Sequence, residues 1–465
     1  MPRALVAILA LGVLLRIAWS AAAFEPPFKD PRTTMSKMYV RSAYLLVTGN
    51  GYSQVTSGSP AQRQLDSVIS GEIELAPGET ITKEGLHPET LHPPGASLVA
   101  AALILLLNVN GWHALQVAGG LADLAGIYLV WRLALSLRPE SPGLATVAAL
   151  VYAAFPPLLA ATSSARDIAF MSPLSLLALG TYLRYFRTRR RRWFVVSAMV
   201  TGVAAYFRPD ALLFTAFLGF AHAREFFAAP SVAHLTRCLA RPFLATLLAM
   251  AVLIPWAARN NSVIDQWVFT STGSGCTLVT GLGTYPNPWG FGRSDIDRHR
   301  EAKAEGFRDG FDPAADPFFR KKFVEAVKSH PTEFATIVAR RMLMPIAPPY
   351  DWGLDLKGET SWGELRSRGE NPLNHASYII RSYWPNILSS ALAALGLVGM
   401  IHWALRGEWH PELLLVLILP YMYVIVTHLF THMAPYYLLP AVGCQILGLA
   451  YLATLLFPAR VKAAA

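Results

Sequence analysis

The stretch "RYFRTRRRRW" (residues 184–193) is the largest single source of the chain's positive charge, and it lies between two apolar runs. Apolar runs of about 20 residues cross the hydrocarbon of a membrane as helices. Cytoplasmic loops that join such helices carry an excess of Lys and Arg. We therefore predict that residues 184–193 form a cytoplasmic loop. The net charge of +10 then reflects membrane topology, and no nucleic-acid partner is expected.

The composition agrees with a chain built from such helices. Of the 465 residues 53% are hydrophobic and only 15% are charged, which is more apolar than a soluble protein of this size can hide in one core. We predict an all-α polytopic membrane protein of the inner or plasma membrane. Runs of suitable apolarity cover residues 4–23, 114–135, 143–162, 168–185, 193–207, 211–227, 242–258, 385–405, 413–430 and 435–457.

Counting spans in both directions from the loop at 184–193 gives a consistent topology with both termini inside. One shorter run, residues 96–109, would be one crossing too many between two outside loops. We therefore expect it to be re-entrant or half-spanning, which leaves about 10 full spans. Two long polar segments, 24–92 and 259–383, then lie on the same outer face.

This topology divides the chain into three parts: an N-terminal transmembrane module (1–258) with the external loop 24–92, an external domain (259–383) and C-terminal transmembrane helices (384–465). In the external domain, apolar residues recur at helical spacing on both sides of Pro331. Since proline interrupts a helix, the pattern predicts two short helices in a small α-rich domain.

The first candidate catalytic residues directly follow the first span. Glu25 and Asp30 stand in "FEPPFKDP" (24–31), where prolines end the helix at the water boundary. A carboxylate at the depth of the lipid head groups can accept a proton from an incoming hydroxyl or amine, which is the role of a general base. The alternative is that both are charges of a solvated loop.

A second charged group stands at the outer ends of later spans. Arg166 and Asp167 lie in "TSSARDIAF" (162–170), and Arg208 lies in "AYFRPDALL" (205–213), between two spans with almost no loop. An arginine in this place suits a phosphate, whose oxygens it binds in a bidentate manner. The alternatives are a local pair between Arg166 and Asp167 and an Arg208 that extends to the interface.

Three further residues are candidates at the same face. Arg259 follows the span at 242–258 and is a third candidate for the phosphate. His92, in "LHPETLHPPGA" (86–96), precedes a helix start, and its spacing from His87 does not predict a helical metal pair. Tyr436 begins the last span, where an aromatic belt is the alternative to a substrate contact. Neither a metal site nor a nucleotide-binding motif is predicted, because the corresponding motifs are missing.

The chain resembles the GT-C superfamily of polytopic glycosyltransferases, in the branch of the protein O-mannosyltransferases and the aminoarabinose transferases of lipid A. Six segments carry the resemblance, in order along most of the chain: "YVRSAYLLVTGNGY" (39–52), "HPPGASLVAAAL" (92–103), "SSARDIAFMSPLSLLAL" (163–179), "VTGVAAYFRPDALL" (200–213), "IPWAARNNSV" (254–263) and "HPTEFATIVARRML" (330–343).

The resemblance implies transfer of a sugar from a polyprenyl-phosphate carrier to a lipid, glycan or protein acceptor at the outer face, with inversion at the anomeric carbon. Asp30 is the closest match to the acid of the family's first loop, and Glu25 is its rival. Asp167 corresponds to a second acid, and Arg208 to the arginine of an Arg-Pro segment. His92, Tyr39 and Tyr436 are candidate substrate contacts.

Two other functions use the same topology. A transporter or flippase for lipid-linked sugars would be expected to bury charges along a path at mid-membrane, whereas the charges here gather at span ends. A polymerase or ligase of lipid-linked glycans shares the donor and the topology with the glycosyltransferase.

Overall fold

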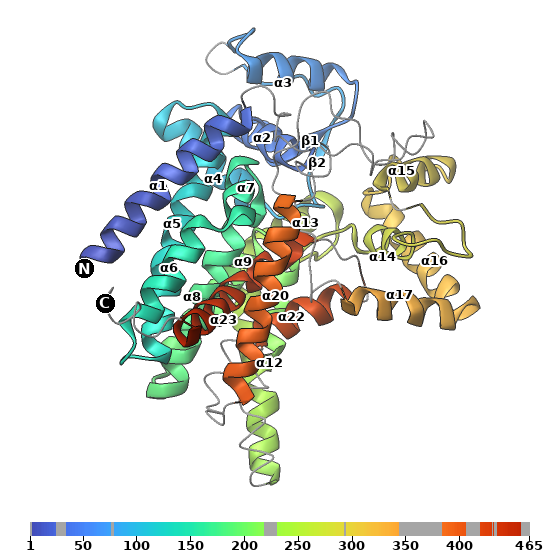
Figure 1. Ribbon diagram of the computed structural model, residues 1–465. Helices are drawn as coiled ribbons and strands as arrows, with labels where there is room; N and C mark the ends of the chain where they lie inside the picture. The colour runs from blue at the N-terminus through green and yellow to red at the C-terminus, as the bar shows by residue number, and fades with distance from the viewer. Residues whose placement is uncertain are drawn as a thin grey trace, which may run out of the picture.

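The computed structural model describes residues 2–24, 34–75, 79–217, 230–292, 294–343, 384–405, 419–429, 431 and 435–456. Across these ranges the chain is a bundle of helices, with α14, α15, α16 and α17 gathered to one side of it (Figure 1). The described strands, β1 (Ser53–Val55) and β2 (Leu86–Pro88), form one antiparallel pair in which Gln54 lies opposite His87. The predicted all-α class is confirmed.

The elements of the bundle, in chain order, are α1 (Arg3–Phe24), α2 (Thr34–Val47), α3 (Pro60–Ser70), α4 (Gly95–Leu107), α5 (Gly111–Leu137), α6 (Pro142–Ala154), α7 (Pro156–Ser163), η1 (Asp167–Phe170), α8 (Met171–Thr188), α9 (Arg191–Ala205), η2 (Pro209–Leu212), α10 (Leu213–Phe217), α12 (Val232–Val252) and α13 (Ile254–Ile264). Near the C-terminus they are α20 (Trp384–Leu405), α22 (Leu419–Leu429), η7 (Pro435–Ala441) and α23 (Val442–Leu456).

Several of these helices have the length and apolarity of membrane spans. Among the described residues 4 qualify: Arg3–Ala21, Gly111–Leu137, Val232–Val252 and Tyr437–Leu456. The helices α6 and α7 together form either a broken span or a re-entrant loop: they are bent by 44° at Phe155, where Pro156 and Pro157 interrupt the helix. The protein is therefore an integral membrane protein by these helices, and the total of about 10 spans stays a prediction.

Two elements differ in extent from the apolar runs of the sequence. The run at 96–109 forms α4, which has 13 residues. At 1.5 Å per residue it is about 20 Å long, short of the roughly 30 Å of hydrocarbon. The run at 242–258 is the end of a longer helix: α12 begins at Val232 because the Ser231 side chain accepts the backbone N–H of His234. Pro255, in the first turn of α13, then starts a new helix after Leu253.

Helix packing in the bundle relies on glycines where backbones approach closely. A Cβ atom on Gly396 or Gly399 of α20 would lie within 2.3 Å of a backbone oxygen of α23. Small residues of this kind permit close contact between membrane helices, where packing drives association. At the far end of the same contact, the rings of Trp403 and Tyr451 stack with their centroids 4.6 Å apart.

A buried ion pair fixes α1 against α5. The Arg16 guanidinium donates two hydrogen bonds to the Asp123 carboxylate, with the Nε–H at 2.9 Å, and it also donates to the Gly12 carbonyl at 2.8 Å. Both side chains are at most 5% exposed. A charge in a membrane helix is tolerated when it pairs inside the bundle. The pair therefore anchors the helix that leads to residues 25–33.

The helices beyond α13 are α14 (Ser274–Leu282), α15 (Asp295–Ala304), η3 (Pro313–Ala315), α16 (Asp316–Ser329) and α17 (Pro331–Leu343). The predicted pair of helices on either side of Pro331 is confirmed in α16 and α17. Cys276, Val279, Ala302, Ala315 and Phe319 form a small core of their own. The division of the chain into three parts, with an external domain at 259–383, stays a prediction.

Candidate active site

Arg208 is the centre of a cluster of charged side chains at the turn between α9 and η2. Its backbone is extended, as expected for a residue that precedes a proline. The Nε–H donates to Oδ1 of Asp210 at 3.0 Å, and Nη1 lies 3.6 Å from Oδ2 of Asp167. The guanidinium lies over the ring of Tyr437, 4.5 Å from its centroid. Two carboxylates and one aromatic face therefore fix the orientation of this cation.

The second oxygen of Asp210 faces α22. Nε2 of His428 lies 3.4 Å from Oδ2 of Asp210, and the Tyr423 hydroxyl lies 3.5 Å from the same atom. The rings of His428 and Tyr437 stack at 4.3 Å. Burial by itself would raise the pKa of Asp210, but Arg208 and His428 outweigh it and hold the pKa well below its usual range. The carboxylate is therefore charged at neutral pH.

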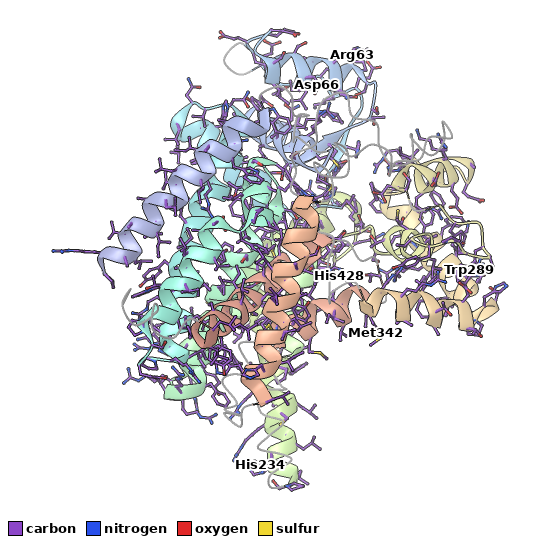
Figure 2. The ribbon with its side chains drawn as sticks, in the orientation of Figure 1. Arg63, Asp66, His234, Trp289, Met342 and His428 are labelled. Carbon is purple, nitrogen blue, oxygen red and sulfur yellow. The ribbon has the colours of Figure 1, made fainter. Side chains whose placement is uncertain are left out.

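Figure 2 shows where this cluster lies in the molecule. The labelled His428 stands near α22, on the side of the bundle that faces α14 and α17 (Figure 2). The cluster draws on η1, η2, α22 and η7, which are far apart in the sequence. It therefore depends on how the helices pack against one another.

Tyr39 connects the cluster with the loop that contains His92. Its ring, buried in α2, meets the His92 ring edge-on at 5.9 Å. Burial is the main cause that raises the pKa of Tyr39, and the charge of Asp167 raises it further, whereas Arg208 and Arg166 act in the opposite direction. The Tyr39 hydroxyl therefore lies within electrostatic reach of all three charged groups.

The loop before α4 holds His92 in a fixed orientation. Oε1 of Glu89 accepts the backbone N–H groups of Leu91 at 2.7 Å and of His92 at 3.0 Å, while Oε2 lies 3.3 Å from Nδ1 of His92. The Tyr52 hydroxyl donates to the His92 carbonyl at 3.0 Å. The predicted loop followed by a helix start is confirmed, since α4 begins at Gly95.

Gly95 ties this loop to the turn that carries Arg208. Its N–H donates to the Tyr206 carbonyl at 2.7 Å. A Cβ atom at position 95 would lie 2.5 Å from that same oxygen, which is far too close for a contact between nonbonded atoms. Only glycine permits the loop and the turn to approach in this way.

Arg259 contacts the same loop from α13. Its guanidinium donates to the backbone carbonyls of Glu89 and Tyr52. It also lies 5.2 Å from the centroid of the Trp256 ring. In this conformation the Arg259 side chain supports the loop. The assignment of Arg259 as a phosphate ligand therefore stays a prediction.

The structure therefore brings together most of the described residues that the sequence singled out. Asp167 and Arg208 are in contact, Arg166 precedes Asp167 in the chain, and Tyr39 and His92 pack against each other. Glu25, Asp30 and the side chain of Tyr436 lie outside the described residues.

Four residues of the cluster and its loop were missed by the sequence analysis: Asp210, His428, Tyr437 and Glu89. Asp210 follows the Arg-Pro pair directly, and Glu89 stands three positions before His92, so local spacing gave a signal for both. His428 and Tyr437 gave none, because a histidine and a tyrosine at the end of a span are common at a membrane interface.

The described residues also permit a test for metal ligands. Within these ranges, no group of three or more His, Cys, Asp and Glu side chains is placed to hold a metal ion.

Comparisons with known proteins concern the fold. No family model and no curated protein matches the sequence. Among solved structures, the oligosaccharyltransferase of Archaeoglobus fulgidus in its apo form matches 99% of this chain and 51% of its own length, at 14% identity and a TM-score of 0.53. A second structure of that enzyme, tethered to an acceptor peptide with the NVT sequon, matches 98% of this chain and 50% of its own length, at 12% identity and a TM-score of 0.50.

The chain thus spans about half the length of this archaeal enzyme. ArnT from Cupriavidus metallidurans, in the apo state, is also found, with 96% of this chain and 76% of its own length covered, at 14% identity and a TM-score of 0.39. The two matches with a TM-score of 0.50 or more show a shared fold: this chain has the fold of the archaeal oligosaccharyltransferase, in agreement with the GT-C resemblance stated from the sequence.

Proposed function

We propose that the protein is a glycosyltransferase that moves a sugar from a polyprenyl-phosphate donor to an acceptor at the outer face of the membrane, with inversion. The observation that carries the proposal is the position of Arg208. Asp210, Asp167 and Tyr437 hold its guanidinium, and Tyr437 begins the candidate span Tyr437–Leu456. The end of a span is the depth at which the phosphate of a lipid carrier would meet water.

The reaction needs positive charge at the leaving group. As the bond between the anomeric carbon and the phosphate oxygen breaks, its electron pair passes to the phosphate. A fixed cation stabilises that developing charge, and fixing it beforehand avoids reorganisation during the reaction. Arg208 is such a cation. Its Nη1 atom lies 3.6 Å from the Asp167 carboxylate, and we place the phosphate oxygen at this edge of the guanidinium.

The reaction also needs a group that accepts the proton of the acceptor. The new bond forms between the acceptor's oxygen or nitrogen and the anomeric carbon, on the face opposite the phosphate, and the proton passes to a carboxylate. Asp30 is our first candidate and Glu25 the second. α1 and α2 lead into and out of the segment that contains them, and Tyr39 of α2 lies beside the cluster. Asp167, His92 and Tyr39 are then positioned to contact the sugar or the acceptor.

The test is transfer of radiolabelled sugar from a panel of polyprenyl-phosphate sugars to membrane acceptors by the purified protein. We expect transfer by the wild type and its loss in Asp30→Asn, with Glu25→Gln retaining it. Glu305→Gln, a charge-matched change on the exposed end of α15, is the control. If no donor gives transfer and labelled lipid-linked sugar instead crosses reconstituted vesicles, the protein is a flippase and the proposal is wrong.

A further inference from the structure

Three helices meet at the buried side chain of Arg341. This residue lies near the end of α17 and is 0% exposed. Its Nη1 donates to the Leu429 carbonyl at 2.8 Å, and its Nη2 donates to the Gly281 carbonyl. Leu429 ends α22, and Gly281 lies in the last turn of α14. One guanidinium therefore joins the ends of two helices that come from different parts of the chain.

The chemistry of this contact suits an arginine. The last carbonyls of a helix have no partner within the helix, and they stand at the negative end of its dipole. A guanidinium offers several donors in a fixed plane and can satisfy two such carbonyls at once. Burial lowers the pKa of Arg341 to about 10, which still leaves the side chain charged at neutral pH.

The backbone around Arg341 is packed tightly. A Cβ atom on Gly281 would lie only 1.8 Å from the Thr431 carbonyl oxygen, so that α14 touches the chain just beyond the end of α22. α17 also packs against α22. The end of α22 is thus enclosed between α14 and α17, and Arg341 is the charged link between the three.

This helix end carries His428, the neighbour of Leu429. Nε2 of His428 lies 3.4 Å from the Asp210 carboxylate, and Asp210 in turn binds Arg208. A shift of the end of α22 by one or two ångströms would therefore break the contact on which the second oxygen of Asp210 depends.

We propose that Arg341 is a positioning residue: it holds the end of α22, and with it His428, in place at Asp210, and thereby couples α14 and α17 to the candidate active site. Its effect on catalysis rests on the proposed function, whereas its effect on the position of His428 does not. A ligand that moves α14 or α17 would then change the charged cluster, with Arg341 as the charged link to it.

The experiment measures how well His428 is protected. Diethyl pyrocarbonate modifies accessible neutral imidazoles, and mass spectrometry of the digested protein gives the rate at each histidine. The full-length protein in nanodiscs is compared with Arg341→Met, Arg341→Lys and Arg340→Met. Arg340 is the matched control, since it is the adjacent arginine, is exposed, and lies over the Tyr285 ring. His234, at the remote end of α12 (Figure 2), reports on general unfolding.

We expect the rate at His428 to rise at least about tenfold in Arg341→Met, because both hydrogen bonds of the buried guanidinium are lost. It should stay within about twofold of wild type in Arg340→Met, and Arg341→Lys should restore most of the protection, since an ammonium still donates to one of the two carbonyls. The rate at His234 should not change. The proposal would be overturned if His428 were as well protected in Arg341→Met as in wild type. It would also be overturned if Arg340→Met exposed His428 as much as Arg341→Met does.

Two further measurements keep the result interpretable. If Arg341→Met does not fold, Gly281→Ala retains the arginine but pushes against Thr431. In Gly281→Ala the modification rate of His428 should rise, while the modification rate of His234 should not change. Unchanged protection of His428 in this variant contradicts the proposal. With an active donor, the turnover number of Arg341→Met should fall at least about tenfold and recover in Arg341→Lys. A wild type without transfer refutes the proposed function, while the modification rates still test Arg341.

Discussion

Arg208 donates its Nε–H to Asp210 at 3.0 Å, a shorter contact than those of Arg208 with Asp167 and of His428 with Asp210. Asp210 is held charged by Arg208 on one side and His428 on the other. A carboxyl whose pKa is lowered by folding adds stability at pH values above its unfolded pKa of about 3.9, and this stability is lost as the pH falls below that value. The ion pair between Arg208 and Asp210 therefore stays charged across the neutral pH range, in which the enzyme would work.

Replacing Arg208 tests the phosphate-binding role. Arg208→Met removes the cation and leaves Asp210 with only its contacts to His428 and Tyr423, so that we expect transfer to fall at least about a hundredfold. Arg208→Lys should recover only part of it, because one ammonium cannot reach both carboxylates as a guanidinium does. The measurement is kcat/KM for the lipid donor.

The control for this prediction is Arg63→Met. Arg63 is an exposed arginine of α3 that donates to the Gly58 carbonyl, and it is labelled at the edge of the molecule in Figure 2. Its loss should leave transfer within about twofold of wild type. Near-normal transfer by a folded Arg208→Met protein would remove Arg208 from the mechanism.

The buried ion pair between Arg16 and Asp123 in the membrane helices gives a prediction about the free energy of unfolding. Arg16→Leu leaves Asp123 buried without its cation, which should cost about 3–5 kcal/mol, while the double change with Asp123→Leu should recover most of the loss. The free energy of unfolding in detergent measures both. If the double variant is as unstable as the single one, the pair contributes through packing and not through charge.

The close contact between Gly95 and the Tyr206 carbonyl predicts that a larger side chain at position 95 lowers the activity. Gly95→Ala brings a methyl group against the Tyr206 carbonyl and should displace the His92 loop from the turn of Arg208. We expect transfer to fall roughly tenfold or more, because small displacements of a site are costly for rate. The control is Gly180→Ala in α8, where a Cβ would meet no atom within 4 Å. Equal transfer by the two variants would show that the contact at Tyr206 does not position the site.

The cysteines test the predicted sidedness. Cys238 is only partly buried and lies in the part of α12 that precedes the apolar run at 242–258, on the side that the count of spans from residues 184–193 predicts to be cytoplasmic, whereas burial raises the pKa of Cys276 to about 12. An impermeant maleimide should therefore label Cys238 only after vesicles of native orientation are opened, and should label Cys276 only after unfolding. Cys238→Ser is the control for the labelled site. Labelling of Cys238 in sealed vesicles would show that the topology is the opposite of the predicted one, with the charged cluster around Arg208 on the cytoplasmic face.

The sequence by itself determined the helices. The apolar runs at 4–23 and 114–135 became α1 and α5, and Pro331 separates α16 from α17 as expected. Helices could be predicted because their hydrogen bonds join residues four positions apart, and because proline and long apolar runs act locally.

The tertiary structure alone decided which charges meet. Arg16 was visible in the first apolar run, but its partner Asp123 was not, and the contact of Asp210 with His428 joins η2 to α22. Side chains that pair in this way come from elements whose relative position depends on the packing of many helices. An ion pair requires atoms to approach within about 4 Å, and no local pattern in the sequence records that distance.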